Sequence, residues 1–429
     1  MENSVKNLIQ FIDHSPSCFH VIENAKKQFL EHGFIQLEEK EHWNLEEGKS
    51  YFVERNGSSM IAFHLPKKDF QGFHIVASHS DSPTYRIKEQ PEMSVEKHYT
   101  KLNIERYGGM IPETWFDRPL SVAGRIIIEE NGQIKDQLVN IDRDLMIIPN
   151  LAIHMSRSSN ESKQLNPQKD LLPLCGGNLT KDGFEEMIAK ESGVEKEDIL
   201  SYDLFLYNRM RGTTLGINEE FVVAPKLDDL ECAYSSIEGM LNAKLSKDYV
   251  TVCALFDNEE VGSGTKQGAG STFFPEVLKR ISYLCGKNEE EYYMAVADSF
   301  MLSADNAHAV HPNYQDKTDP TNRPYINEGI VLKYNASQKY TTDANSAALV
   351  KYLCKKEKIK CQVFFNRSDM LGGSTLGNIL TGQVSIKAAD IGLPQLSMHS
   401  TYETAGCKDL DDMITLMGSF YELGKEVQI

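Results

Sequence analysis

Two adjacent glutamates, Glu259 and Glu260, follow an apolar run, 249–256, and precede a turn that contains two glycines. The apolar run predicts a buried strand, so the pair is expected in a tight turn between buried elements. Burying carboxylates without partners is costly, and a bound cation relieves that cost. Because adjacent side chains point in different directions, one glutamate can bind a metal ion while the other handles protons. The alternative for such a pair is an exposed acidic loop.

His79 and Asp81 stand two residues apart after a second apolar run, 73–78. Imidazole is a common zinc ligand, and a carboxylate at this spacing can hold the other ring nitrogen in the required tautomer. The spacing alone is weak evidence, because a chain with 12 histidines and 62 acidic residues contains such pairs by chance. The alternative for this pair is a histidine at the end of a strand whose ring nitrogens have hydrogen-bond partners and bind no metal.

Further candidate ligands lie in three other segments: Asp228 with Asp229, Asp305 with His308 and His311, and His399. A two-metal site needs a carboxylate that bridges the ions, further nitrogen and oxygen ligands, open positions for water and a nearby base. The sequence offers every part, so the joint occurrence favours a dinuclear metal site. For His308 and His311 the alternative is a structural role outside the ligand set.

The elements expected to position these side chains are strands whose carboxyl ends meet. The runs 73–78, 249–256, 294–297 and 384–391 each lead toward a histidine or an acidic residue. In open α/β sheets the ligand crevice lies at the carboxyl ends of the strands, so we expect the polar clusters to share one cleft. The glycine-rich segments 262–268 and 372–377 match neither a phosphate-binding loop nor a nucleophile elbow.

Helical segments alternate with these runs, which predicts an α/β domain. Apolar residues at helical spacing predict an N-terminal helix in 3–12 and a C-terminal helix from Asp409. Between about residues 89 and 220 the pattern changes, and Asn131-Gly132 between two apolar runs predicts a β-hairpin. For 429 residues we expect two domains, one formed by 1–88 and 221–429 and a β-rich insert at 89–220.

The formal net charge of −17 repels phosphate backbones and anionic membrane surfaces, so neither nucleic acid nor a membrane is an expected partner. No apolar run reaches the length of a membrane span, and the N-terminus lacks the pattern of a secretory signal. The eight cysteines include no Cys-x-x-Cys pair, as expected of reduced thiols. We therefore expect a cytoplasmic protein.

Seven segments together resemble the aspartyl aminopeptidases, peptidase family M18, and the resemblance extends across nearly the whole chain. They are 77–83 (ASHSDSP), 114–118 (TWFDR), 148–154 (IPNLAIH), 224–228 (APKLD), 256–263 (FDNEEVGS), 303–314 (SADNAHAVHPNY) and 394–400 (PQLSMHS). The resemblance implies an α/β zinc-peptidase catalytic domain, 1–88 and 221–429, with a mixed central sheet flanked by helices. It also implies that 89–220 is a smaller β-rich dimerisation or lid domain.

The resemblance further implies two divalent metal ions per subunit, zinc by preference, held by five residues: His79, Asp228, Glu260, Asp305 and His399. His79 and Asp305 are expected on one ion and Glu260 and His399 on the other, with Asp228 bridging both. The implied activity is removal of single acidic residues from peptides with a free N-terminus.

Beside the ions, the resemblance implies that Glu259 is the general base and that Asp81 orients His79. Lys333 matches the family's candidate for binding the side chain of an N-terminal Asp or Glu, although a surface lysine is its alternative. Two histidines are further candidates for substrate binding: His308, and His154 from a neighbouring subunit. The implied assembly is a dodecamer built from dimers.

Two departures from the family pattern stand out. Asp229 takes the place of the usual Asn, and 372–375 is GGST where the family usually has Cys-Gly-Thr-Thr. The first can alter metal preference and the second the shape of the substrate cleft. A broad-specificity aminopeptidase or deacylase with the same ions is the alternative function. A non-catalytic assembly or cargo protein is a remote one, because no ligand or base is lost.

Overall fold

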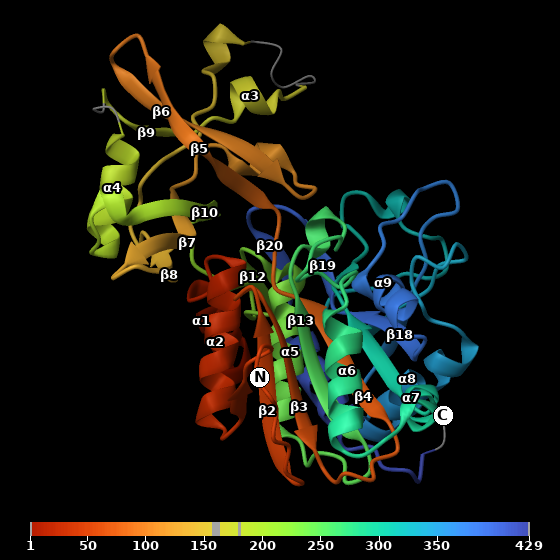
Figure 1. Cartoon of the computed structure of the whole chain (residues 1–429). Coiled ribbons are helices and arrows are strands. Elements are labelled where there is room, and N and C mark those ends of the chain that lie inside the picture. The colour runs from red at the N-terminus through yellow and green to blue at the C-terminus, as the bar shows by residue number, and fades with distance from the viewer. Residues whose placement is uncertain (1, 157–163, 179–181, 428–429) are drawn as a thin grey trace.

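The computed structural model describes residues 2–156, 164–178 and 182–427, and its main body is built on a nine-stranded sheet (Figure 1). The strand order is β1 (Ile35–Leu37), β2 (Lys49–Arg55), β3 (Ser59–Leu65), β13 (Val250–Phe256), β4 (Phe73–His79), β14 (Phe300–Ala304), β18 (Lys387–Gly392), β16 (Ile330–Lys333) and β17 (Cys361–Phe364). The four strands from β13 to β18 in this order are parallel. Their carboxyl ends therefore share one edge of the sheet.

Helices cover both faces of this sheet, which confirms the predicted α/β class. One face packs on α1 (Glu2–Asp13), α2 (Cys18–Glu31), α5 (Leu227–Asn242), α8 (Ala344–Glu357) and α10 (Cys407–Tyr421). The other packs on α6 (Phe273–Leu284), α7 (Glu289–Ala297) and α9 (Leu376–Gln383). Strand residues alternate between the two cores: Val76 of β4 joins the first, whereas Ile75 and Ala77 join the second.

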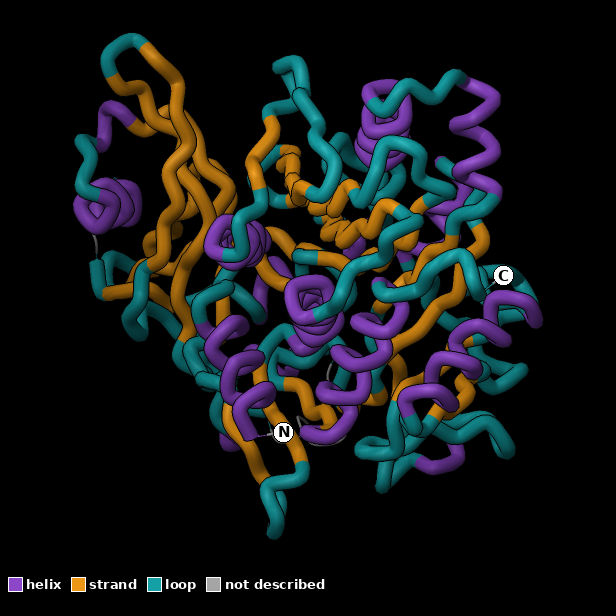
Figure 2. The backbone as a smooth tube through the Cα atoms, turned by 90° about the horizontal axis from the view of Figure 1, so that it is seen from below, coloured by secondary structure: helices purple, strands orange, loops and turns teal. Residues whose placement is uncertain are grey.

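A second sheet of six antiparallel strands has its own apolar core and lies beside the main body (Figure 2, left). Its order is β8 (Gln133–Asn140), β7 (Leu120–Glu130), β10 (Ile199–Asn208), β5 (Thr84–Val95), β6 (Tyr99–Tyr107) and β9 (Leu174–Gly176), with α3 (Pro167–Asp170) and α4 (Gly183–Ser192) attached. The predicted hairpin is confirmed: Glu130 pairs with Gln133, and Asn131 and Gly132 have φ of 54° and 76°.

A third sheet joins the segments that flank the second sheet to the C-terminal part of the chain. Its order is β11 (Thr213–Leu215), β12 (Phe221–Ala224), β20 (Glu403–Gly406), β19 (Pro394–Leu396) and β15 (Ala307–His308). Short 3-10 helices are η1 (Pro112–Trp115), η2 (Ile153–Met155), η4 (Lys196–Asp198), η5 (Glu259–Val261) and η6 (Gln315–Lys317). Within the described residues no helix is long and apolar enough to cross a membrane. The eight cysteines, all described, are free thiols.

One strand prediction is wrong. Residues 294–297 form the last turn of α7, which begins at a capping box made by Asn288 and Glu291. The strand is the next element, β14. Asp298 therefore lies at the amino end of β13, where Tyr249 donates a hydrogen bond to it (3.0 Å), and not at the carboxyl edge. Four apolar residues cannot distinguish a strand from the buried side of a helix.

The crossing of α5 and α10 generates a stability prediction. A Cβ added at Gly239 of α5 would lie 2.9 Å from Cβ of Met417, whereas one at Gly418 of α10 would meet no atom closer than 3.6 Å. Gly239→Ala should overpack the contact and destabilise the fold by about 1–3 kcal/mol. Gly418→Ala has room and gains helix propensity of about 1 kcal/mol. Thermal unfolding should show a lower midpoint for the first variant only, and equal midpoints would contradict this packing.

Candidate metal centre

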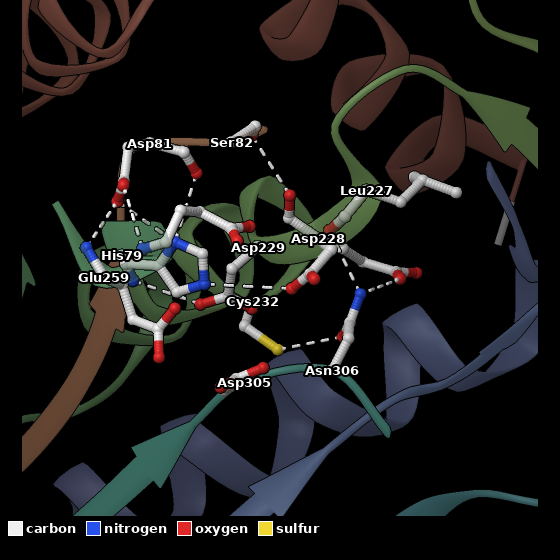
Figure 3. A network of polar contacts seen from close by, with 12 residues as sticks. His79, Asp81, Ser82, Leu227, Asp228, Asp229, Cys232, Glu259, Asp305 and Asn306 are labelled. Carbon is white, nitrogen blue, oxygen red and sulfur yellow. Dashed lines mark hydrogen bonds and ion pairs between the residues drawn. The ribbon is translucent and has the colours of Figure 1, made fainter. Parts of the chain in front are cut away.

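The carboxyl edge of the nine-stranded sheet gathers most of the predicted ligands. His79 ends β4, Asp305 follows β14 directly, and Glu259 and Glu260 form η5 just after β13. Asp228 joins them from the first turn of α5. Figure 3 shows the side chains of His79, Asp228, Glu259 and Asp305 converging from these separate elements.

The carboxylate of Asp228 stands between two histidines that come from distant parts of the chain. Its Oδ1 lies 3.8 Å from Nε2 of His79, and its Oδ2 lies 3.1 Å from Nε2 of His399. Nε2 of His399 is also 3.5 Å from Oε1 of Glu260. Zinc–ligand bonds of about 2.0–2.2 Å place tetrahedral ligand atoms about 3.4 Å apart. Each oxygen of Asp228 thus faces a different position that could hold a cation.

The potential ligand atoms form two groups that share Asp228. One group consists of His79, Asp228, Asp229 and Asp305, and the other of Asp228, Glu260 and His399; within each group the atoms lie within 4.8 Å of one another. Glu259 lies in a further group of this size with His79 and Glu260. All five predicted ligands and the predicted base therefore meet in one place.

Three buried carboxylate oxygens in these groups accept no hydrogen bond from any described residue: Oδ1 of Asp228, Oδ1 of Asp229 and Oε1 of Glu260. Buried charges without partners are costly, and bound cations would satisfy them. Burial, with the neighbouring carboxylates, raises the pKa of Glu259 to about 8 and that of Glu260 well above its ordinary value. Imidazole nitrogens and carboxylate oxygens are ligands that zinc accepts, so the residues fit this metal.

Asp81 lies beside the candidate ligands and contacts three residues of the site. Nδ1 of His79 is 3.1 Å from the main-chain oxygen of Asp81 and 3.4 Å from its Oδ1. The carboxylate also accepts hydrogen bonds from the main-chain N–H groups of Glu259 (3.1 Å) and Glu260 (3.2 Å). Asp81 therefore fixes the turn that carries both glutamates as well as the ring of His79, which its position after His79 alone did not indicate.

Glu403 is a buried residue of the site that the sequence analysis missed. Its two oxygens accept hydrogen bonds from the main-chain N–H of Asp228 (2.9 Å) and of His399 (2.6 Å). It thereby joins the backbones of two residues that face the same cation position. The only signal in the sequence is an acidic residue four positions after His399, a spacing common in any acidic chain.

Asp229, the acidic neighbour of Asp228, adds a further carboxylate to the site. The side chain is fully buried, and its Oδ2 accepts a hydrogen bond from the main-chain N–H of His79 (3.1 Å). The peptide bond between Asp228 and Asp229 is cis. The extra acid belongs to the group around His79 and adds a potential oxygen ligand to that half of the site.

Lys333 is buried beside the site rather than solvated on the surface. Its Nζ donates hydrogen bonds to the main-chain oxygens of Asp305 (2.7 Å) and Asn306 (3.1 Å), and it stands 5.1 Å from the ring centre of Tyr340. Burial lowers its pKa, but the carboxylates of Asp305 and Asp390 outweigh burial and hold the pKa above its ordinary value. Lys333 is thus a cation with two carbonyl partners, and its ammonium also forms an ion pair with Oδ1 of Asp305 at 3.7 Å.

The two remaining predicted histidines lie in different places. His308 ends β15, is exposed, and faces Phe364 at 6.0 Å between ring centres. Phe364 also contacts Tyr340, so His308 lies on the same side of the site as Lys333. His154 lies in the exposed turn η2 near the second sheet, and among the described residues no polar contact links it to the site.

Comparison with known proteins identifies the family of the chain. The family profile described as "Aminopeptidase I zinc metalloprotease (M18)" matches residues 11–421. The chain is 45% identical over 431 residues to the probable M18 family aminopeptidase 2 of Clostridium acetobutylicum, covering 97% of this chain and 98% of that protein. It is 36% identical over 424 residues to the protein of the same description from Pseudomonas aeruginosa strain UCBPP-PA14, with 97% of each covered.

Solved structures are also similar to this chain over nearly its whole length. The chain superposes with a TM-score of 0.95 on a chain of the cryo-EM structure of the Ape4 and Nbr1 complex, at 36% identity, with 98% of this chain and 85% of that chain covered. The TM-score is 0.85 for the mApe1 dodecamer of S. cerevisiae, at 27% identity and 98% and 97% coverage. The chain therefore belongs to the M18 family of zinc aminopeptidases, hydrolases that act on peptide bonds.

Proposed function

We propose that this M18 aminopeptidase uses two zinc ions, bridged by Asp228, to remove acidic residues from peptides with a free N-terminus. The observation that carries the two-ion proposal is the placement of the Asp228 oxygens, one facing His79 and the other His399. Oδ1 of Asp228 and Oε1 of Glu260, which accept no hydrogen bond from the described residues, support it. His79 and Asp305 would complete one ion's ligands, and Glu260 and His399 those of the other.

When bound, zinc supplies a Lewis acid that polarises the scissile carbonyl and acidifies water. The protein's own contribution is proton transfer by Glu259. Its carboxylate accepts a proton from the attacking water and later returns it to the amine that leaves. Glu259 is half-buried beside His79, and its backbone N–H donates a hydrogen bond to Asp81. These contacts hold it next to the proposed ligands, although it belongs to neither of the two groups that share Asp228.

Glu259→Gln tests this role. The amide cannot accept the proton, so kcat should fall by about 10²–10⁴-fold. Zinc content should remain near wild type, because Glu259 is not a proposed ligand. Elemental analysis and peptide hydrolysis measure the two quantities, with Glu289→Gln, exposed on α7, as the matched control. A wild-type rate in Glu259→Gln would contradict the proposal, as would activity that persists after a chelator has removed the metal.

Acidic specificity is proposed from the position of Lys333. Its ammonium is buried at the end of β16 and donates to two main-chain oxygens. It stands 3.7 Å from Oδ1 of Asp305, longer than a hydrogen bond, so its third N–H would donate to a substrate carboxylate. A charge-assisted hydrogen bond from such a buried donor discriminates strongly against neutral side chains. The net charge of −17 disfavours acidic peptides only at long range, since salt screens it beyond about 8 Å.

Lys333→Met should lower kcat/KM for peptides that begin with Asp or Glu by about 10–100-fold, the value of a hydrogen bond to a charged group. Peptides that begin with Ala should lose far less. A substrate panel with free and blocked α-amines measures the selectivity and separates an aminopeptidase from a deacylase. Lys355→Met is the control, because Lys355 is exposed in the last turn of α8. An equal loss on Asp-led and Ala-led peptides would show that Lys333 does not contact the substrate side chain.

We propose that residues 89–220 form a dimerisation domain inserted in the catalytic domain, 1–88 and 221–429, and that dimers assemble further into a dodecamer. Three apolar residues around His154 support a protein interface there: Leu151, Ile153 and Met155 are 51%, 47% and 76% exposed. The similar mApe1 structure is a dodecamer. In this arrangement His154 would reach the site of the neighbouring subunit. The free cysteines favour a reducing location, the cytoplasm.

A complementation experiment tests the exchange of His154. His154→Ala and Glu259→Gln subunits should each be weakly active alone. In mixed dimers, one site combines an intact Glu259 with His154 from the partner. After random mixing about half of the dimers are mixed, and each mixed dimer has one complete site out of two. About a quarter of all sites should therefore be active. No recovery after mixing, with assembly verified by light scattering, would contradict action across subunits.

A further inference from the structure

Tyr107, the last residue of β6 in the six-stranded sheet, reaches into the metal centre from outside the catalytic sheet. Its hydroxyl donates a hydrogen bond of 2.6 Å to Oδ2 of Asp81 and accepts one of 2.8 Å from Nδ2 of Asn258. Both partners belong to the main body of the protein. The phenol is therefore held by one acceptor and one donor in a single orientation.

Asp81 is the residue through which this contact can act. The oxygen that accepts from Tyr107 also accepts from the main-chain N–H of Glu260, and the other oxygen accepts from that of Glu259. Oδ1 lies 3.4 Å from Nδ1 of His79. Moving the carboxylate of Asp81 would therefore displace His79 and the turn that carries both glutamates.

The four residues after Tyr107 continue along the same side of the site. A Cβ added at Gly108, whose φ is +78°, would lie 3.0 Å from Cβ of Glu260. A Cβ at Gly109 would lie 3.7 Å from Nδ1 of His399, and the main-chain N–H of Ile111 donates to the main-chain oxygen of His399 (3.0 Å). The segment 107–111 thus contacts Asp81, Glu260 and His399. These residues serve both proposed cation positions.

The environment of Tyr107 favours its role as a donor. Its ring packs edge-on against Phe205 of β10 (5.8 Å between centres) and borders a cavity of about 270 Å³ between the second sheet and the site. Burial and the carboxylate of Asp81 raise the pKa of the phenol, so it keeps its proton. A rigid, protonated tyrosine is a suitable support for a carboxylate that must not move.

We infer that Tyr107 is a positioning residue of the hydrolytic centre and that segment 107–111 couples the placement of the six-stranded sheet to the geometry of the metal ligands. This inference rests on the proposed metal site. In the proposed assembly, subunit contacts on the six-stranded sheet would then bear on metal affinity through this segment.

Tyr107→Phe tests the inference with metal binding as the readout. Co²⁺ is titrated into chelator-treated full-length protein and followed by its visible absorption, alongside kcat and KM of the zinc-loaded enzyme. Losing a support of this kind costs about 10–100-fold in metal affinity or rate. We expect Co²⁺ affinity to fall in that range, and kcat to fall more than KM rises.

Tyr202→Phe is the matched control. Tyr202 lies on β10 of the same sheet, is buried, and donates to the main-chain oxygens of Lys88 (2.8 Å) and Glu89 (2.9 Å), away from the site. It should bind Co²⁺ as the wild type does. If Tyr107→Phe also binds Co²⁺ and turns over like the wild type, the inference is wrong while the proposed function stands. A wild-type protein that binds no Co²⁺ would overturn the proposed function and the inference together.

Gly108→Ala provides a second variant that does not involve the hydroxyl. The added methyl group meets Glu260, so Co²⁺ affinity should again fall by about 10-fold or more. Gly132→Ala is its control, because Gly132 lies in the same sheet with a similar φ of +76° but has no atom within 4 Å of an added Cβ. Equal Co²⁺ affinities in these two variants would contradict the coupling.

Discussion

Repulsion between buried carboxylates is the constraint on which the rest of this structure depends. Ligand atoms of Asp228 lie within 4.8 Å of those of Asp229 and Asp305 in one group and of Glu260 in the other, and Asp229 is fully buried. Like charges at such distances cannot all remain ionised in a buried site unless cations lie among them. The fold concentrates negative charge at one point, and this concentration is what gives the site its capacity for divalent metal ions.

The candidate ligands come from strands and a helix that are packed in the core of the main body. Parallel strands β13, β4 and β14 bring their carboxyl ends to one edge, and α5 adds Asp228 from a helix packed across the sheet. Two buried acids then hold the backbone: Asp81 fixes the glutamate turn, and Glu403 joins Asp228 to His399. The site is therefore positioned by main-chain hydrogen bonds as much as by its own side chains.

The sequence predicted the parts of this site that depend on strand ends. Apolar runs that end just before His79 and Asp257 locate the carboxyl edge, and the family resemblance named five candidate ligands that the structure brings together. Hydrogen bonds between distant segments were beyond prediction: Glu403 and Tyr107 contact residues far away in the chain, and no local pattern marks them. The strand predicted at 294–297 was wrong because its helix is specified by a cap outside the apolar run. The burial of Lys333 likewise follows from tertiary packing that a single residue type does not reveal.

The most direct test of the bridging role of Asp228 is a crystal structure of the zinc-loaded protein with anomalous diffraction recorded on both sides of the zinc edge. The account predicts two zinc peaks about 3.5–4 Å apart, one on each side of the Asp228 carboxylate. The first should lie by His79 and Asp305, and the second by Glu260 and His399. A fully loaded crystal with a single peak, or with peaks that do not share Asp228, would contradict it.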